Sequence, residues 1–150
     1  MEYEERLLNA INALKVVPFG SIWIINDAVW KRVIADYVVK RRHHPGIAIS
    51  RRERFDRLTD IVPCMIGTSQ KSSSGTGFRV ENVMPHSNKK HTYFKVVRPC
   101  HLHGDASPEL AVKNFCGNYE FIRRNRGKAL LDDGEKTGLV KFLTRKGLKF

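Results

Sequence analysis

The sequence predicts a mainly β protein with a helix at each end, and three observations support this. Short apolar or alternating stretches, separated by brief polar loops, fill residues 20–103, as in small, strongly bent antiparallel barrels. Amphipathic stretches with helical spacing lie on either side, within residues 2–16 and 107–146. The 150 residues are enough for one core and show no internal repeat or linker. We therefore expect a single domain over residues 1–150.

The N-terminal part of the chain predicts a helix followed by a strand. Residues 2–16 place three glutamates in the first turn, where the helix dipole favours anions, and Pro18 and Gly20 end the helix. Residues 21–25 are a short apolar strand, and residues 27–40 fit either a hairpin or a short helix. The apolar side chains that define one face of the first helix are Leu7, Leu8, Ile11 and Leu14.

Four more strands are expected in the middle of the chain, and two helices after it. The strands cover residues 45–50, 59–69, 76–83 and 92–102, with a very basic connector after the first. Ser107 and Pro108 are a good helix start, as N-cap and first helical residue. A last helix over about residues 135–145 is expected to turn three apolar side chains inward, those of Leu139, Val140 and Leu143.

The charge of the chain points to a polyanionic partner. Twenty-seven Lys and Arg against 15 Asp and Glu give a formal net charge of +12, which favours nucleic acid or an acidic protein. The N-terminus is acidic, unlike a signal peptide, and no apolar run reaches the length of a membrane span. Three cysteines are too few and odd in number for a disulfide framework. These features predict a protein of the reducing cytoplasm.

Three segments carry side chains that could perform chemistry. The Ser/Gly loop within residues 69–77 could be a slack connector, a phosphate cradle or the rim of an active site. Residues 40–45, KRRHHP, could neutralise phosphate and transfer protons, or could be a solvated charge run. In CHLH, His101 and His103 share one face of an extended chain and could bind a metal together, although paired CxxC spacing is missing and exposed histidines fit equally. We expect no metal and no cofactor.

Four short motifs lie in order within residues 20–103: Gly20-Ser21-Ile22-Trp23, His44-Pro45-Gly46-Ile47-Ala48-Ile49-Ser50, Val62-Pro63-Cys64 followed by Thr68 and Ser69, and Phe78-Arg79-Val80. In this order they resemble the PemK/MazF family of toxin ribonucleases. Two of them differ from the family pattern: His44 stands where the family has arginine, and three residues separate the V-P-x step from Thr68. An N-terminal helix and an insertion between the first two strands are extra.

The resemblance implies an SH3-like β-barrel that forms a homodimer, cleaves single-stranded RNA without a metal and is held inactive by an acidic antitoxin. Cleavage by the 2′-hydroxyl needs a base, an acid and cations around the phosphate. His44 would transfer a proton, Arg41 or Arg42 would supply the cation, and Thr68 and Ser69 would hydrogen-bond the phosphate. The residues expected to bind the RNA backbone are Lys71, Ser72, Ser73, Lys89 and Lys90.

Two other functions fit the same sequence. The first is a nucleic-acid-binding barrel that does not cut, which the net charge and the missing family arginine favour. The second is a toxin of the same fold that acts on a protein target such as gyrase.

Overall fold

The computed structural model describes residues 5, 16–27, 30–31, 43–55, 62–68, 77–81, 83, 91–95 and 128–147. Several predictions lie outside this part of the chain: most of the first helix, most of residues 27–40, the Ser/Gly loop, the CHLH segment and the helix expected after Ser107. Among the described residues no helix is long and apolar enough to cross a membrane.

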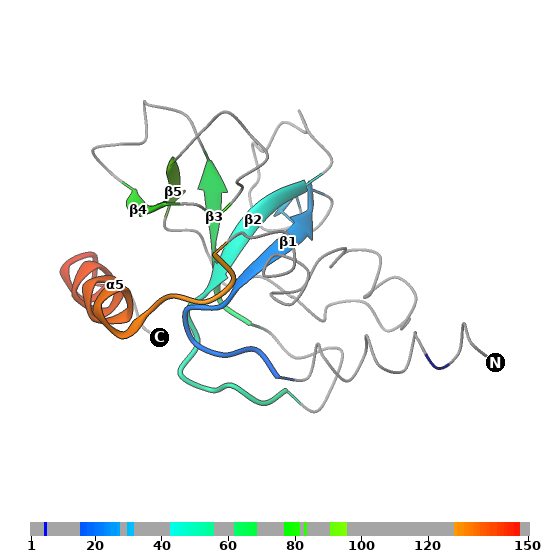
Figure 1. Cartoon of the computed structure of the whole chain (residues 1–150), viewed down its shortest axis with the longest axis horizontal. Helices are drawn as coiled ribbons and strands as arrows, with labels where there is room; N and C mark the ends of the chain where they lie inside the picture. Colours follow the sequence, from blue (N-terminus) through cyan, green and yellow to red (C-terminus); the bar gives the residue numbers. More distant parts are fainter. Residues whose placement is uncertain are drawn as a thin grey trace.

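A five-stranded antiparallel sheet forms the centre of the molecule (Figure 1). Its strands lie in the order β1-β2-β3-β5-β4, which confirms the mainly β prediction. In the part of the chain that the structure describes, β1 and β4 are the edge strands and do not pair with each other, so a closed barrel is not seen there. The strands are β1 (Ile22–Asn26), β2 (His43–Ala48), β3 (Cys64–Thr68), β4 (Phe78–Glu81) and β5 (His91–Lys95).

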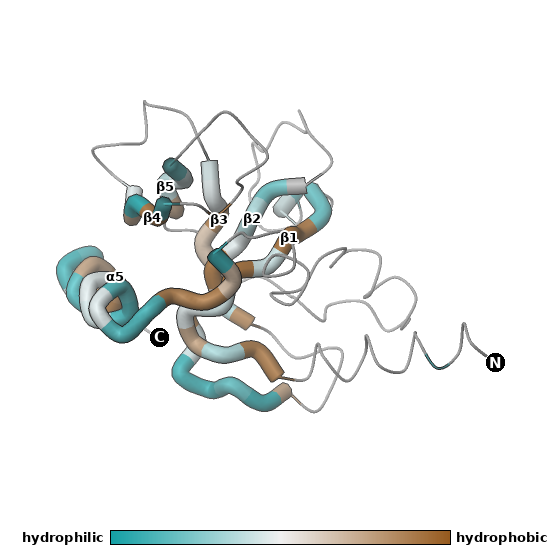
Figure 2. The backbone as a smooth tube through the Cα atoms, in the orientation of Figure 1, coloured by the Kyte–Doolittle hydropathy of each residue, from teal (hydrophilic) through white to brown (hydrophobic). Residues whose placement is uncertain are grey.

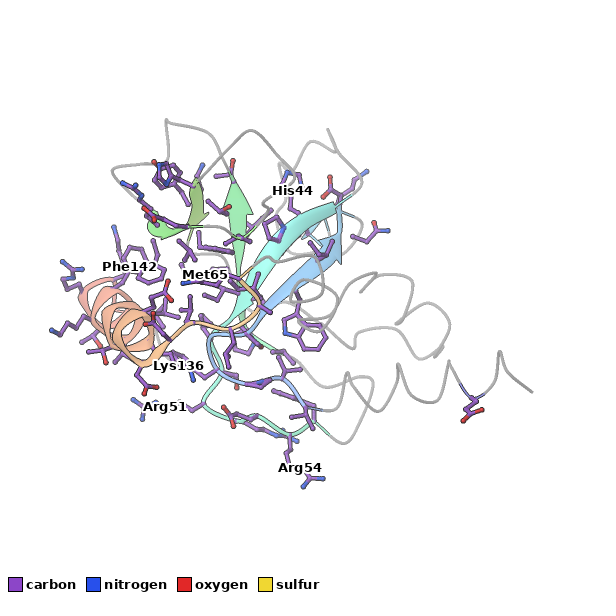
Figure 3. All side chains as sticks on the ribbon, viewed as in Figure 1. His44, Arg51, Arg54, Met65, Lys136 and Phe142 are labelled. Atoms are coloured by element: carbon purple, nitrogen blue, oxygen red, sulfur yellow. The ribbon has the colours of Figure 1, made fainter. Side chains whose placement is uncertain are left out.

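One face of the sheet carries the apolar core and is covered by α5 (Asp133–Arg145). Figure 3 shows Met65 of β3 and Phe142 of α5 between the sheet and the helix. The rings of Phe78 and Phe142 are 5.7 Å apart at 56°, a tilted arrangement that aromatic pairs favour. Among the described residues, the buried members of this core are Ile22, Ile24, Ile47, Ile49, Met65, Val80, Val83, Phe94, Ala129, Leu131, Leu139 and Leu143.

The last helix begins two residues earlier than its apolar pattern predicts, because a capping box defines its start. The side chain of Asp132 accepts from the backbone N–H of Glu135 at 2.7 Å, and the Glu135 carboxylate accepts from the Asp132 N–H at 3.1 Å. Glu135 is thus the third helical residue rather than the first. Leu139 and Leu143 are buried as expected, whereas Val140 is only half-buried.

The chain before β1 is held by the basic connector after β2. Val16, expected at the end of the first helix, instead forms an isolated β-bridge with Arg54. The Val17 N–H donates to the Glu53 carbonyl at 2.8 Å, and the Phe19 N–H donates to the Glu53 carboxylate at 3.0 Å. Figure 2 shows this connector as a hydrophilic segment of the tube, and Figure 3 places Arg54 at its outer side.

Candidate functional site

The strongest functional feature among the described residues is a contact between a histidine and a buried carboxylate. Nδ1 of His44 lies 2.6 Å from Oδ1 of Asp27. The Asp27 side chain is 1% exposed and that of His44 is 21% exposed. The pair therefore links a carboxylate in the interior to an imidazole that reaches solvent.

Pairing of β1 with β2 positions the two residues. His44 lies opposite Ile25 in the register of these strands, and Asp27 follows directly after β1, where the chain turns into helical backbone at Asp27, Trp30 and Lys31. The Trp30 ring packs over β2 at Gly46, where a Cβ would come within 2.8 Å of Trp30 Cζ2. The glycine thus lets the segment that carries Asp27 lie close against the strand that carries His44.

The chemistry of this pair follows from which ring nitrogen faces the carboxylate. An ionised Asp27 accepts a hydrogen bond, so His44 carries a proton on Nδ1 and its basic lone pair is on Nε2. Burying an unpaired carboxylate costs free energy. Loss of the contact with His44 would therefore be unfavourable, and this holds the imidazole in its orientation. Within the described residues, Oδ2 of Asp27 has no hydrogen-bond partner. A carboxylate that orients a histidine is the arrangement used to prepare a general base or acid.

Cross-strand register extends the site away from His44 along one face of the sheet. Gly46 pairs with Ile66, and His44 and Thr68 each lie two residues from this pair, on the same face of the sheet. Thr68 pairs with Tyr93, and Tyr93 pairs with Arg79. Residues that lie directly opposite each other share a face, so Thr68, Tyr93 and Arg79 form a line across β3, β5 and β4, and His44 lies on the same face of β2. We call His44, Thr68, Tyr93 and Arg79 the polar row.

A second polar cluster lies at the β4 end of this row. Nη2 of Arg79 donates to the Glu81 carboxylate at 3.0 Å and to Nε2 of His91 at 3.2 Å. His91 Nδ1 lies 3.7 Å from the same Glu81 oxygen. Because Arg79 can only donate, Nε2 of His91 is the acceptor and its ring proton is on Nδ1. All three side chains are at least one third exposed.

Of the residues that the sequence assigned to the site, the structure describes His44 and Thr68, and it places them on the neighbouring strands β2 and β3. The other predicted residues lie outside the described part of the chain: Arg41, Arg42, Ser69, Lys71, Ser72, Ser73, Lys89 and Lys90. Among the residues that are described, no group of three His, Cys, Asp or Glu side chains could hold a metal ion.

Asp27, Tyr93 and Arg79 were missed by the sequence reasoning. A single aspartate after an apolar strand gives no sign that it will be buried against a residue of the next strand. Strand alternation places Arg79 and Glu81 on one face of β4, and it places His91 and Tyr93 on one face of β5. Only the pairing of β4 with β5 shows that all four side chains lie on the same face of the sheet.

Comparisons of the chain with protein-family models, with curated proteins and with solved structures find no match. The case for a function therefore depends on the residues and the geometry described above.

Proposed function

We propose that this protein is an endoribonuclease that cleaves single-stranded RNA by attack of a 2′-hydroxyl on the neighbouring phosphate, without a metal ion. The observation that carries the proposal is the 2.6 Å contact between His44 and the buried Asp27. This contact orients an imidazole, a group that exchanges protons near neutral pH. The net charge of +12 supports a polyanionic substrate.

The reaction needs two proton transfers, and His44 is suited to one of them. A base removes the proton of the 2′-hydroxyl as its oxygen bonds to phosphorus, and an acid protonates the 5′-oxygen as the bond to phosphorus breaks. The products are a 2′,3′-cyclic phosphate and a 5′-hydroxyl. Thr68, on the neighbouring strand and on the same face of the sheet as His44, carries a hydroxyl suited to a phosphate oxygen. Arg41 and Arg42 are close to His44 in the sequence and are proposed to stabilise the charge on the phosphate.

The biological setting proposed for this activity is a type II toxin–antitoxin system of the cytoplasm. The resemblance of the sequence motifs to the PemK/MazF family supports it, together with the open antiparallel sheet, which we propose closes into an SH3-like barrel and dimerises. An acidic antitoxin that competes with RNA for the basic surface fits the charge of +12.

The test is an RNA cleavage assay with purified protein and single-stranded RNA in EDTA. We expect products that end in a 2′,3′-cyclic phosphate, and no cleavage of an oligonucleotide with 2′-deoxyriboses throughout. In His44→Asn, the amide nitrogen can still donate to Asp27 but cannot transfer a proton, so cleavage should fall about 10²-fold or more while RNA affinity stays within about twofold, less than the effect of losing one phosphate contact. Lys141→Ala, an exposed position of α5, is the matched control.

Three outcomes would overturn the proposal in different ways. Full activity of His44→Asn would remove the role of His44. Salt-sensitive RNA binding without cleavage would identify a non-catalytic nucleic-acid-binding protein, which the histidine in place of the family arginine favours. Inhibition of gyrase without RNA cleavage would identify a toxin with a protein target.

A further inference from the structure

Beyond His44 and Thr68, the polar row continues with two side chains that the proposed reaction does not use. Tyr93 lies on β5, next to Thr68 on one side and next to Arg79 of β4 on the other. The opposite face of the same strand packs into the core, because Thr92 and Phe94 are buried. Tyr93 is therefore held on a strand that is anchored in the core, with its ring half-buried on the polar face.

We infer that Tyr93 stacks on a base of the bound RNA and that Arg79 binds a phosphate of the same strand, so that the RNA crosses the sheet from His44 to Arg79. This inference rests on the proposed function, because it takes His44 as the place where the strand is cut. Aromatic side chains on the open face of a sheet are a common platform for bases of single-stranded RNA.

The guanidinium of Arg79 is positioned for a phosphate. Its side chain is 52% exposed, and both of its hydrogen bonds among the described residues are made by Nη2, to Glu81 and to His91. The Nε–H and the N–H groups of Nη1 then remain, and because they point in different directions each can donate a single hydrogen bond to a phosphate oxygen. Glu81 and His91 fix the direction of the guanidinium.

The length and charge of the face favour single-stranded RNA as the occupant. His44 and Arg79 are separated by three strand spacings, or about 14 Å between their backbones, which is too far for one phosphate and requires several nucleotides. Lys95 lies two residues from Tyr93 on the same face and is exposed. Arg79 and Lys95 outweigh Glu81, so this part of the sheet carries a positive charge that complements the RNA backbone.

The experiment uses short oligonucleotides with 2′-deoxyribose at the cleavage position, so that binding is measured without cutting. The fluorescent base 2-aminopurine is placed at successive positions, and stacking quenches its emission. We expect strong quenching at one position in the wild-type protein, loss of it in Tyr93→Ala and retention in Tyr93→Phe. Tyr93→Ala should also weaken binding about 5- to 150-fold, the range of one base–aromatic stack.

Arg79→Ala should reduce the salt dependence of binding. The slope of log affinity against log salt should become less steep by about 0.7, the contribution of one phosphate contact on a single strand. The control Lys141→Ala should leave both the slope and the quenching unchanged.

The outcomes separate this inference from the proposed function. Cleavage by the wild-type protein with unchanged quenching and salt slope in both variants would keep the nuclease and overturn the path across the sheet. Quenching that depends on Tyr93, in a protein that does not cut RNA, would support the path and overturn the nuclease. If Tyr93→Ala changes only the mass of the oligomer in sedimentation, the face is a contact between copies and the inference is wrong.

Discussion

Replacing Gly46 with alanine tests how closely the segment carrying Asp27 is packed against β2. A Cβ at this position would lie 2.5 Å from Cδ1 of Ile25 and 2.8 Å from Cζ2 of Trp30. Real Cβ atoms do not come so close to other carbons, so one or both of these buried side chains must move. Trp30 is three residues from Asp27 on helical backbone, so its displacement shifts the carboxylate away from His44.

The expected loss of stability follows from two opposing effects. Overpacking of a well-packed core costs about 1–3 kcal/mol. Alanine is favoured over glycine in a strand by roughly 0.5–1 kcal/mol, because glycine loses more backbone entropy on folding. The two ranges together leave a loss of up to about 2.5 kcal/mol. Because the new Cβ would meet two buried side chains, we expect Gly46→Ala to lower the free energy of unfolding by about 1–2 kcal/mol and to lower RNA cleavage as well.

The measurement is urea unfolding followed by circular dichroism, with Gly138→Ala as the matched control. A Cβ at Gly138 meets only Cε1 of Phe78, at 3.8 Å, which is ordinary contact. This glycine lies inside α5, where alanine should raise stability by up to about 1 kcal/mol. Glycine-to-alanine substitution should thus lower the free energy of unfolding at position 46 and raise it at position 138. An unchanged or raised stability in Gly46→Ala, with the control behaving as expected, would refute the packing argument.

Three further predictions concern the carboxylates and the charge. Asp27→Asn should lower cleavage about 10²-fold or more, because an amide can hold the imidazole in the wrong tautomer. Since Asp27 acts by positioning His44, the pH profile of cleavage should also change shape, and an unchanged profile would contradict this role. Hydrogen bonding to the Glu135 N–H lowers the pKa of Asp132 from its ordinary value of 3.8. The ionised carboxylate therefore stabilises the fold above this ordinary pKa, and the stabilisation is lost as the pH falls through the lower pKa of the folded state. Asp132→Asn keeps the cap but should remove this part of the acid unfolding curve, measured by circular dichroism below pH 4 (about the unfolded value of an aspartate). RNA affinity of the wild-type protein should fall with salt by a log–log slope of about −0.7 for each phosphate contact, and a flat response in a filter-binding assay would exclude an electrostatic groove.

The strands could be predicted from the sequence because their signal is local. Alternation over Phe78–Glu81 and the apolar runs at Ile22–Asn26 and Cys64–Thr68 are read from neighbouring residues alone. Boundaries differ by a few residues, and the start of α5 differs because the reciprocal hydrogen bonds of Asp132 and Glu135 outweigh the apolar pattern.

The site could be predicted only in part. His44 and Thr68 were predicted as site residues from the motifs, and this role stays a prediction; the structure places Thr68 on β3, and it places His44 within β2 rather than just before the strand. Asp27 was not expected, because its role depends on a contact between residues 17 positions apart in the chain. Insertion of β5 between β3 and β4 was not predictable either, since the order of strands is set by long-range pairing rather than by local pattern.

The junction between Gly20 and Leu131 has a consequence for synthesis of the protein on the ribosome. The Leu131 N–H donates to the Gly20 carbonyl at 3.1 Å, and the Ile22 N–H donates to the Ala129 carbonyl at 2.8 Å. β1 is thus joined to a segment that the ribosome makes long after it has made β1, and the core closes only when Leu139 and Leu143 have been made. Contacts so distant in sequence form late and slowly. Until residues 129–143 have been made, the nascent chain therefore lacks its closed core.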